Sequence, residues 1–330
     1  MKCAMMPANL FNTDTGAADA RFIQSGAAAP WAAVPLADEA DGPGRVAPQV
    51  QRLMLSLAAA SIAAQQHAPA QRLPFHIQGQ WVGSVARAHL ATLQHLVTQL
   101  GLDQASTQQV RLDVQAGGVQ LHGALPSCEA ALTQLNAELR NQGLILGWRD
   151  ERVDVPALGS GRKLLRMERA AARFWGSLTL GAHATGYVPA AQGKPAQVWV
   201  AQRADDKATD PGLWDNLIGG GVTAGQSPFE ALVREGWEEA GLSADVVRQS
   251  RPAARLSLLR DVQAGLQRET LYSHDLALQP AHQPVNQDGE VQRFCLLSLS
   301  DAVALAQSGQ MTLDAALVML DFAQRHGVQA

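Results

Sequence analysis

Three glutamates, Glu235, Glu238 and Glu239, lie within five residues of one another. Carboxylates so close on one helix repel each other unless a positive charge lies among them, and carboxylate oxygen is a ligand that Mg²⁺ prefers. On acidity alone, a solvated acidic helix face is the commoner explanation. Three glycines at residues 219–221 precede the segment, and glycine lets the backbone approach a phosphate closely. The combination favours metal-dependent chemistry on a phosphate.

The segment that carries the glutamates is predicted to be one helix. Ser227 can cap its start, Pro228 suits its first position, Glu230 completes a capping box, and Gly241 supplies the left-handed stop. The three glutamates are expected to share an arc of about 100°, given about 100° per residue. An apolar face is expected on the other side, formed by Phe229, Leu232, Val233, Gly236 and Ala240.

The segment resembles the Nudix box, G-x5-E-x7-R-E-U-x-E-E-x-G-U, where U is aliphatic. The matching residues are Gly220, Arg234, Glu235, Glu238, Glu239, Gly241 and Leu242. Gln226 stands where the first glutamate belongs, and Gly236 stands where a large aliphatic residue is usual. The resemblance implies that Gln226 supports Arg234 through a hydrogen bond without charge assistance, and Gly236 lets the helix pack closely on a strand.

Other segments resemble one Nudix subfamily that carries an N-terminal accessory domain of the DUF4743 type. Its members include the Nudix part of fungal thiamine pyrophosphokinase fusions and plant hydrolases of thiamine diphosphate analogues. The segments are LPFHIQGQWVG, LGWRDE, RAAARFWGSLTLGAHATGYV, VWVAQRADDKATDPGLWDNLIGGG, DGEVQRFCLLS and MTLDAALVMLDFAQRHG; one departure is Thr185, where asparagine is expected. The resemblance implies an α+β protein, a Nudix α/β/α sandwich with a mixed sheet preceded by a small α+β domain. It also implies hydrolysis of thiamine diphosphate, or its oxidised oxo- and oxy- analogues, to the monophosphate and phosphate.

The resemblance also implies roles in the reaction. Glu235 and Glu239 are expected as primary ligands of Mg²⁺, with Mn²⁺ as the alternative, and the Gly220 carbonyl is expected to join them. Glu238 is expected as a ligand or as the general base. Glu290 is a candidate second base, and a solvated turn residue is the alternative interpretation.

Candidate substrate contacts precede the glycines. Trp214 could stack on a ring, Asp215 could face a cationic ring or amine, and Asn216 is the adjacent polar residue. The alternative interpretation is that Trp214 is a core residue and Asp215 caps the loop. Lys207 and Arg203 could bind phosphate, although solvated surface cations are commoner. The histidines His183 and His274 are expected to be structural.

The chain is predicted to have three sections, a poorly ordered lead-in (1–47), an accessory α+β domain (48–165) and a Nudix domain (166–330). Helices are predicted at 48–66, 86–100, 129–142, 167–175, 227–241, 300–308 and 313–325. A strand or hairpin is predicted at 73–85, and strands are predicted at 110–114, 119–121, 178–188, 197–203, 254–260, 270–278 and 291–297.

The composition of the chain excludes some classes of binding partner. The 330 residues carry a formal net charge of −4, which argues against nucleic acid and against an anionic membrane surface. The longest apolar stretch, 53–64, is too short to span a bilayer, and three scattered cysteines without Cys-x-x-Cys spacing indicate a reducing compartment. A cytoplasmic location and a small-molecule diphosphate substrate are therefore predicted. The sequence leaves the oligomeric state open.

Three other functions stay open. The nearest is hydrolysis of nucleoside diphosphate-linked compounds, because the box selects the linkage and not the leaving group. A second is a ligand-sensing module, which the retention of all three acids disfavours. Isopentenyl diphosphate isomerases are relatives that need a catalytic cysteine, and nothing in the sequence marks Cys128 or Cys295 as one.

Overall fold

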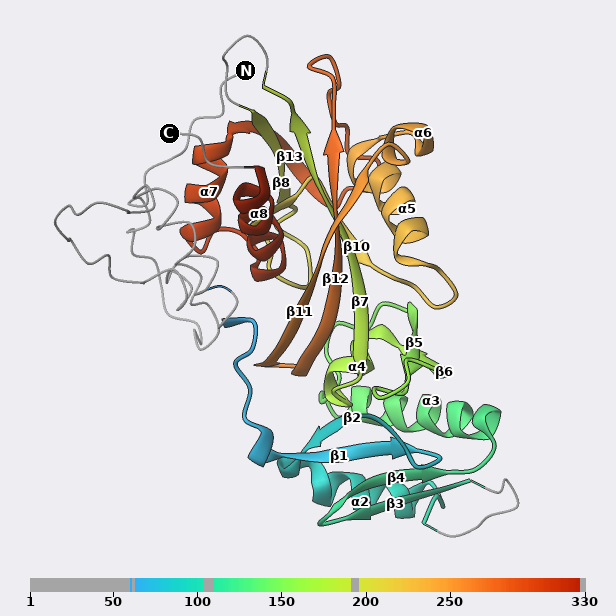
Figure 1. The fold of residues 1–330 in the computed structure, drawn as a ribbon. Coiled ribbons are helices and arrows are strands. Elements are labelled where there is room, and N and C mark those ends of the chain that lie inside the picture. Colours follow the sequence, from blue (N-terminus) through green and yellow to red (C-terminus); the bar gives the residue numbers. More distant parts are fainter. Residues whose placement is uncertain (1–59, 61–62, 104–109, 191–195, 327–330) are drawn as a thin grey trace, which may run out of the picture.

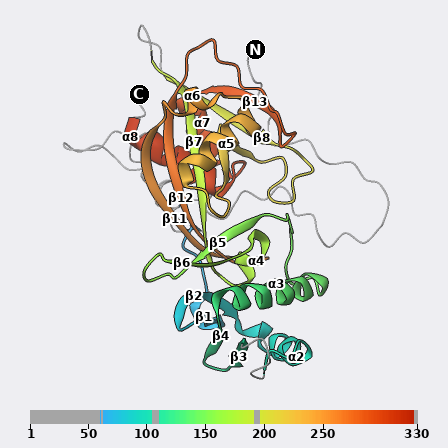
Figure 2. The same cartoon turned by 90° about the vertical axis from the view of Figure 1, so that its right-hand side faces the viewer.

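A computed structural model of the chain describes residue 60 and residues 63–103, 110–190 and 196–326. These residues form an N-terminal α+β part and a larger C-terminal part built on a long sheet, one stacked on the other (Figures 1 and 2). The predicted lead-in and most of the predicted helix 48–66 lie outside the described residues.

The N-terminal part is a four-stranded sheet with strand order β2-β1-β4-β3, in which β1 and β4 are parallel and the two hairpins antiparallel. The first hairpin turns at Gln78 and Gly79, which both have positive φ. The elements are η2 (Pro69–Gln71), β1 (Arg72–Ile77), β2 (Gln80–Ala86), η3 (Arg87–His89), α2 (Leu90–Gln99), β3 (Arg111–Gln115), β4 (Gly118–His122) and α3 (Leu125–Asn141).

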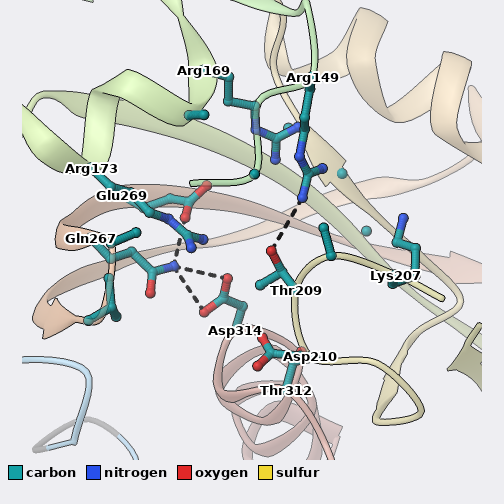
Figure 3. A pocket seen from close by; sticks show the side chains of 18 of the residues that line it. Arg149, Arg169, Arg173, Lys207, Thr209, Asp210, Gln267, Glu269, Thr312 and Asp314 are labelled. Carbon is teal, nitrogen blue, oxygen red and sulfur yellow. Dashed lines mark hydrogen bonds between the residues drawn. The ribbon is translucent and has the colours of Figure 1, made fainter. Parts of the chain in front are cut away.

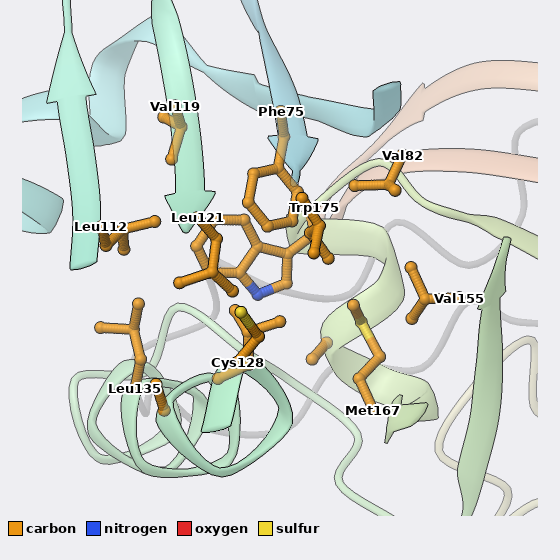
Figure 4. Packing of buried hydrophobic residues seen from close by; sticks show 14 of the residues in the cluster. Phe75, Val82, Leu112, Val119, Leu121, Cys128, Leu135, Val155, Met167 and Trp175 are labelled. Atoms are coloured by element: carbon orange, nitrogen blue, oxygen red, sulfur yellow. The ribbon is translucent and has the colours of Figure 1, made fainter. Parts of the chain in front are cut away.

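A single apolar core holds this part together, and Trp175 lies at its centre (Figure 4). The Trp175 indole is fully buried 4.5 Å from the Phe75 ring, and its N–H donates to Asn136 at 2.7 Å. A Cβ on Gly83 would overlap the Trp175 carbonyl, which accepts from Ser84 N at 2.8 Å. Trp175 therefore joins the N-terminal sheet to the chain that enters the C-terminal part.

A hairpin and a short helix connect the two parts. β5 (Arg152–Pro156) pairs with β6 (Lys163–Glu168), and α4 (Arg169–Phe174) follows directly. Glu168 caps α4 by accepting from Ala170 N at 3.2 Å, and the same oxygen accepts from Arg149 N at 3.1 Å. The predicted boundary at residue 165 falls inside β6 and stays a prediction.

The C-terminal part is a mixed sheet with order β11-β12-β7-β8-β13, in which β10 also pairs with β7 and β9 with β8. Only β12 and β7 are parallel among these pairs of described strands. The strands are β7 (Leu178–Val188), β8 (Gln197–Arg203), β9 (Trp214–Asn216), β10 (Ile218–Gly221), β11 (Arg251–Val262), β12 (Gly265–Ala277) and β13 (Val291–Ser298).

Helices cover both faces of this sheet (Figure 1), so the predicted α/β/α sandwich is confirmed. Alternation along β8 supplies both layers, because Val198 and Val200 join one buried cluster and Trp199 the other. The helices are α5 (Pro228–Ala240) and α6 (Ala244–Val247) on one face, and α7 (Leu299–Gln307) and α8 (Leu313–His326) on the other.

Most predicted elements are present, and the limits of β7 and β8 agree with the prediction. The elements that were not predicted are β5, β6, β9, β10 and α6. They are short or irregular in hydrophobic pattern, and β9 and β10 exist because they pair with β8 and β7. Pairing with β8 and β7 therefore defines β9 and β10 more than local pattern does.

Candidate active site

The box helix α5 is fixed at both ends as predicted. Ser227 accepts from Glu230 N, and the Glu230 carboxylate accepts from Ser227 N at 2.8 Å, so the capping box is complete. Gly241 ends the helix with φ 64°. Before the helix, β10 brings the glycines alongside β7, with Gly219 opposite His183 and Gly220 opposite Ala182.

Glu235 and Glu239 lie on the buried side of α5, with exposed fractions of 8% and 7%. This corrects the expectation that they lie opposite the apolar face of the helix, a stripe of side chains that includes Leu232, Gly236 and Ala240. The buried residues of α5 are Ala231, Leu232, Glu235, Gly236, Glu239 and Ala240, so two carboxylates sit within the stripe. Glu239 accepts from Gly219 N at 2.8 Å, and a Cβ on Gly220 would overlap the Glu235 carboxylate. The glycine strand is thus the surface against which both acids pack.

Burial disfavours the charged form of both acids. It raises the pKa of Glu239 well above the usual value, and the charges of Glu235 and Asp215 add to the shift. Burial also raises the pKa of Glu235, although the Arg234 guanidinium opposes it. Glu235 and Glu239 are thus two buried carboxylates one turn apart that repel each other, and a bound cation would reduce this repulsion.

Glu238 lies apart from the other two acids. Its side chain is 38% exposed and accepts from Arg234 at 2.6 Å, while Arg234 also binds Glu235 at 2.8 Å and the Gly221 carbonyl at 3.3 Å. Among the residues that the structure describes, no group of three or more His, Cys, Asp or Glu side chains is arranged to hold a metal ion. Any bound ion would therefore take ligands from two buried carboxylates, backbone oxygen, water and substrate.

The two departures from the box have different outcomes. A Cβ on Gly236 would lie 2.7 Å from Val247 Cγ2 and 3.1 Å from Ile218 Cδ1, which agrees with the predicted close packing. The predicted hydrogen bond from Arg234 to Gln226 is not formed, and Arg234 instead donates to Glu235, Glu238 and the Gly221 carbonyl. The Gln226 Oε1 atom is buried without a partner among the described residues.

A cavity of about 440 Å³ opens beside the glycine strand and Glu235. Figure 3 shows side chains that line it, among them Arg149, Lys207 and Asp314. Predicted site residues that line it are Gly220, Glu235, Asp215, Arg203, Lys207 and Glu290. The histidine His183 also lines it and is held by Asn216 Oδ1 at 3.0 Å.

Lys207 and Arg203, the two cations predicted to bind phosphate, are paired with carboxylates of the protein itself. Lys207 is bonded to Glu290, and Arg203 binds Asp215 at 3.1 Å and the Thr209 carbonyl at 2.8 Å. Lys207, with support from Arg149 and Arg203, lowers the pKa of Glu290 despite its partial burial. Glu290 therefore lines the cavity as a paired carboxylate, although its side chain is 45% exposed directly after the bend at residues 287–289.

Two predicted substrate contacts lie behind the cavity. Trp214 is 9% exposed within the core that β8 shares with α7 and α8, and the Arg293 guanidinium lies 5.0 Å from its ring centre. Asn216 is 1% exposed and donates to the Ala315 carbonyl at 3.3 Å. Neither lines the cavity, so direct contact with substrate is not supported for either. The short strand β9 turns alternate side chains away, which leaves Asp215 as the cavity residue of the three.

The cavity also contains functional groups that sequence reasoning missed. They come from the loop before β5, from α4, from the β11–β12 hairpin and from α8, and are Arg149, Arg169, Arg173, Arg260, Gln267, Glu269 and Asp314. One signal was available, since Arg169 and Arg173 are four apart on a predicted helix and must share a face. The others come from distant segments that share no local pattern.

The two cysteines weighed for isomerase chemistry are both core residues. Cys128 is fully buried in the N-terminal core, where burial raises the pKa of its thiol (Figure 4). Cys295 is 3% exposed in the core beneath α7 and α8. Neither residue lines the cavity, and the isomerase alternative finds no support.

The capped α5, the glycine strand and the α/β/α sandwich define a Nudix domain. Comparison with known families agrees, since residues 182–317 match the NUDIX domain and residues 53–178 match a domain of unknown function (DUF4743). The chain belongs to the Nudix hydrolase family, whose members act on diphosphate-containing substrates and generally use divalent metal ions.

The similar proteins cover different shares of the chain. Nudix hydrolase 20, chloroplastic, of Arabidopsis thaliana is 31% identical over 259 residues, which cover 77% of this chain and 68% of that protein. Nudix hydrolase 24, chloroplastic, of the same plant is 33% identical and covers 58% of this chain and 52% of its own length. A solved protein from Deinococcus radiodurans is similar at 21% identity and a TM-score of 0.40, over 54% of this chain and 100% of that one.

Proposed function

We propose that this protein is a metal-dependent hydrolase of thiamine diphosphate or of its oxidised oxo- and oxy- analogues, releasing the monophosphate and phosphate. One observation carries the proposal. A single cavity joins the glycine strand and Glu235 of the box to an acidic end formed by Glu269 and Asp314. A diphosphate attached to a positively charged heterocycle has the same two-ended charge pattern.

The metal end fits Mg²⁺ by donor chemistry. Glu235 and Glu239 supply buried hard oxygen ligands, and the Gly220 carbonyl is the proposed backbone ligand. When bound, the ion would neutralise charge on the phosphoryl oxygens and acidify a water. Mn²⁺ prefers similar oxygen donors and remains the alternative.

Two acids are candidates to accept the proton of the attacking water. Glu238 is a partly exposed box residue outside the cavity lining, and it can leave Arg234 at the cost of one surface ion pair, about 0.3–0.5 kcal/mol for an i,i+4 pair. Glu290 lies in the cavity but is charge-paired with Lys207, which makes it a weaker base. We therefore propose Glu238 as the base and Glu290 as the residue that positions Lys207.

The acidic end replaces the predicted stacking on Trp214. Burial and the neighbouring Glu269 charge raise the pKa of Asp314 to about 6, while Arg260 and His183 oppose the shift. Gln267 links the two acids, since its amide donates to Glu269 at 2.9 Å and to Asp314 at 3.2 Å. Among the described lining residues there is no Phe, Tyr or Trp, so a ring here would be recognised by charge and hydrogen bonds.

The test is a hydrolysis panel with Mg²⁺ or Mn²⁺, resolved by chromatography. It would compare thiamine diphosphate, oxythiamine diphosphate and oxothiamine diphosphate with nucleotide sugars and methyl diphosphate. Asp314→Asn should raise KM for thiamine diphosphate and oxythiamine diphosphate, which keep the cationic thiazolium ring, about 10- to 100-fold, the size of a lost charge-assisted contact, and leave methyl diphosphate unchanged. Asp321→Asn is the matched control, because Asp321 is on the same helix and binds Arg325 outside the cavity.

Two results would contradict the substrate assignment. One is preferred turnover of nucleotide sugars by the unaltered enzyme. The other is an equal loss for thiamine compounds and methyl diphosphate in Asp314→Asn. Either result would leave a Nudix hydrolase of another diphosphate.

No helix among the described residues is long and apolar enough to cross a membrane. We propose a cytoplasmic location and a small-molecule substrate without nucleic acid. The names of both plant relatives place those proteins in the chloroplast.

A further inference from the structure

Among the described residues, Arg149 and Arg173 are two cavity cations that form no direct ion pair with a carboxylate. Both line the cavity, and neither has a carboxylate within 4.0 Å in the part of the chain that the structure describes. Within the described part of the chain, the side chain of Arg149 makes one hydrogen bond, to Thr209 Oγ1 at 3.4 Å (Figure 3). Arginine in a partly buried position is usually paired, so the two guanidiniums have unused donors directed at the cavity.

The loop that carries Arg149 is fixed by several contacts. Ile145 is buried in the N-terminal core, Gly147 has φ 70°, and Asp150 has φ 57° while accepting from the Trp148 indole at 2.8 Å. A left-handed Asp is tolerated where its short side chain bonds locally. The Arg149 N–H donates to Glu168, the residue that also caps α4. The backbone of Arg149 is therefore fixed in position relative to the start of α4.

The arginines crowd one another. Burial and the Arg169 guanidinium lower the pKa of Arg149, and Arg173 adds to the effect, while Glu151 and Glu290 oppose it. Arg169 is neutralised by Glu151 at 3.0 Å and packs against Gly221 of the box. Like charges gathered on one wall of a cavity indicate a site for an anion, since an anion between them would remove the repulsion.

We propose that Arg149 and Arg173 form an anion subsite that binds the diphosphate of the substrate, so that the N-terminal accessory part completes the active site. The subsite deepens the proposed function and rests on it for the identity of the anion. Arg149 comes from the segment matched as a domain of unknown function, and this assignment gives that domain a role in binding. The planar guanidinium can donate two parallel hydrogen bonds to phosphate oxygens, which lysine cannot do.

Binding of inorganic imidodiphosphate, a diphosphate analogue with a P–N–P bridge, tests the subsite by calorimetry in the presence of Mg²⁺. Arg149→Gln and Arg173→Gln should each weaken binding about 10- to 100-fold, and Arg149→Lys should recover part of the loss. Arg140→Gln is the control, because Arg140 stacks on the neighbouring Trp148 at 4.8 Å and does not line the cavity. Thermal unfolding checks that each variant is folded.

The outcomes separate this inference from the proposed function. Wild-type affinity in both Arg149→Gln and Arg173→Gln would overturn the subsite, as would no binding to the unaltered protein. If imidodiphosphate binding depends on Arg149 while no thiamine compound is hydrolysed, the substrate proposal fails and the subsite stands. Equal weakening in Arg140→Gln would show a general loss of surface charge and would also overturn the subsite.

Discussion

Replacing Glu239 by glutamine separates the charge of this side chain from its shape. Glutamine keeps an oxygen that can accept from Gly219 N, which lies 2.8 Å from Glu239, and removes the charge that burial and Glu235 disfavour. Two charges one helical turn apart, about 6 Å, repel by about 3 kcal/mol at an effective dielectric constant of about 20. Because Arg234 offsets part of the Glu235 charge, we expect Glu239→Gln to raise the free energy of unfolding without metal by about 1–3 kcal/mol.

The gain in the free energy of unfolding of Glu239→Gln should depend on pH. The pKa of Glu239 is raised above the usual 4.5 in the folded state, so ionisation of Glu239 opposes folding. This destabilisation is absent below the usual pKa and grows as the pH rises above it. The variant and the wild type should therefore be about equally stable near pH 4 and should differ at about pH 8. Asp245→Asn is the control, because that side chain is 90% exposed.

The assay is urea unfolding in a chelator at both pH values, repeated in saturating Mg²⁺, followed by turnover of the best substrate in the panel. In Mg²⁺ the wild type should gain more stability than the variant, because a ligand that binds only the folded state stabilises it. Turnover of the variant should fall by orders of magnitude. A variant less stable than the wild type at pH 8 without metal would refute the repulsion argument, and unchanged turnover in Mg²⁺ would refute the metal assignment.

Two predictions concern the departures from the box. Gln226→Met removes the buried Oε1 atom that lacks a partner and should raise the free energy of unfolding by about 1 kcal/mol; a loss of stability in urea would show that the oxygen is satisfied. Gly236→Ala gains about 1 kcal/mol of helix propensity, but its Cβ would lie 2.7 Å from Val247, where overpacking costs about 1–3 kcal/mol, so we expect a net loss. In a Val247→Ala background the same change should become neutral or stabilising, and an equal loss in both backgrounds would contradict the close-packing explanation.

The sequence by itself determined the box helix, its limits and the class of enzyme. Ser227, Glu230 and Gly241 act on backbone groups within one turn, so their effect is readable from adjacent residues. The strands β7 and β8 were equally readable, since two-residue alternation directs Val198 and Trp199 to opposite faces. Local pattern is sufficient wherever the interacting atoms are close in sequence.

Tertiary structure alone decided which side chains form the site. Helical spacing could place Glu235, Glu238 and Glu239 on one arc, but the position of β10 buries two of them and leaves the third with Arg234. The same applies to Trp214, whose sequence position beside the glycines suggested a ligand contact although packing of α7 and α8 against β8 places it in the core.

Local sequence pattern also could not predict which residues meet in the cavity. Arg149, Arg173, Glu269 and Asp314 are separated by up to 165 residues along the chain and meet in one cavity. Their meeting depends on sheet order, on the parallel pairing of β12 with β7, and on the contacts that join the N-terminal part to α4. These are long-range pairings whose free energy comes from burial across the whole fold, so no local pattern in the sequence records them.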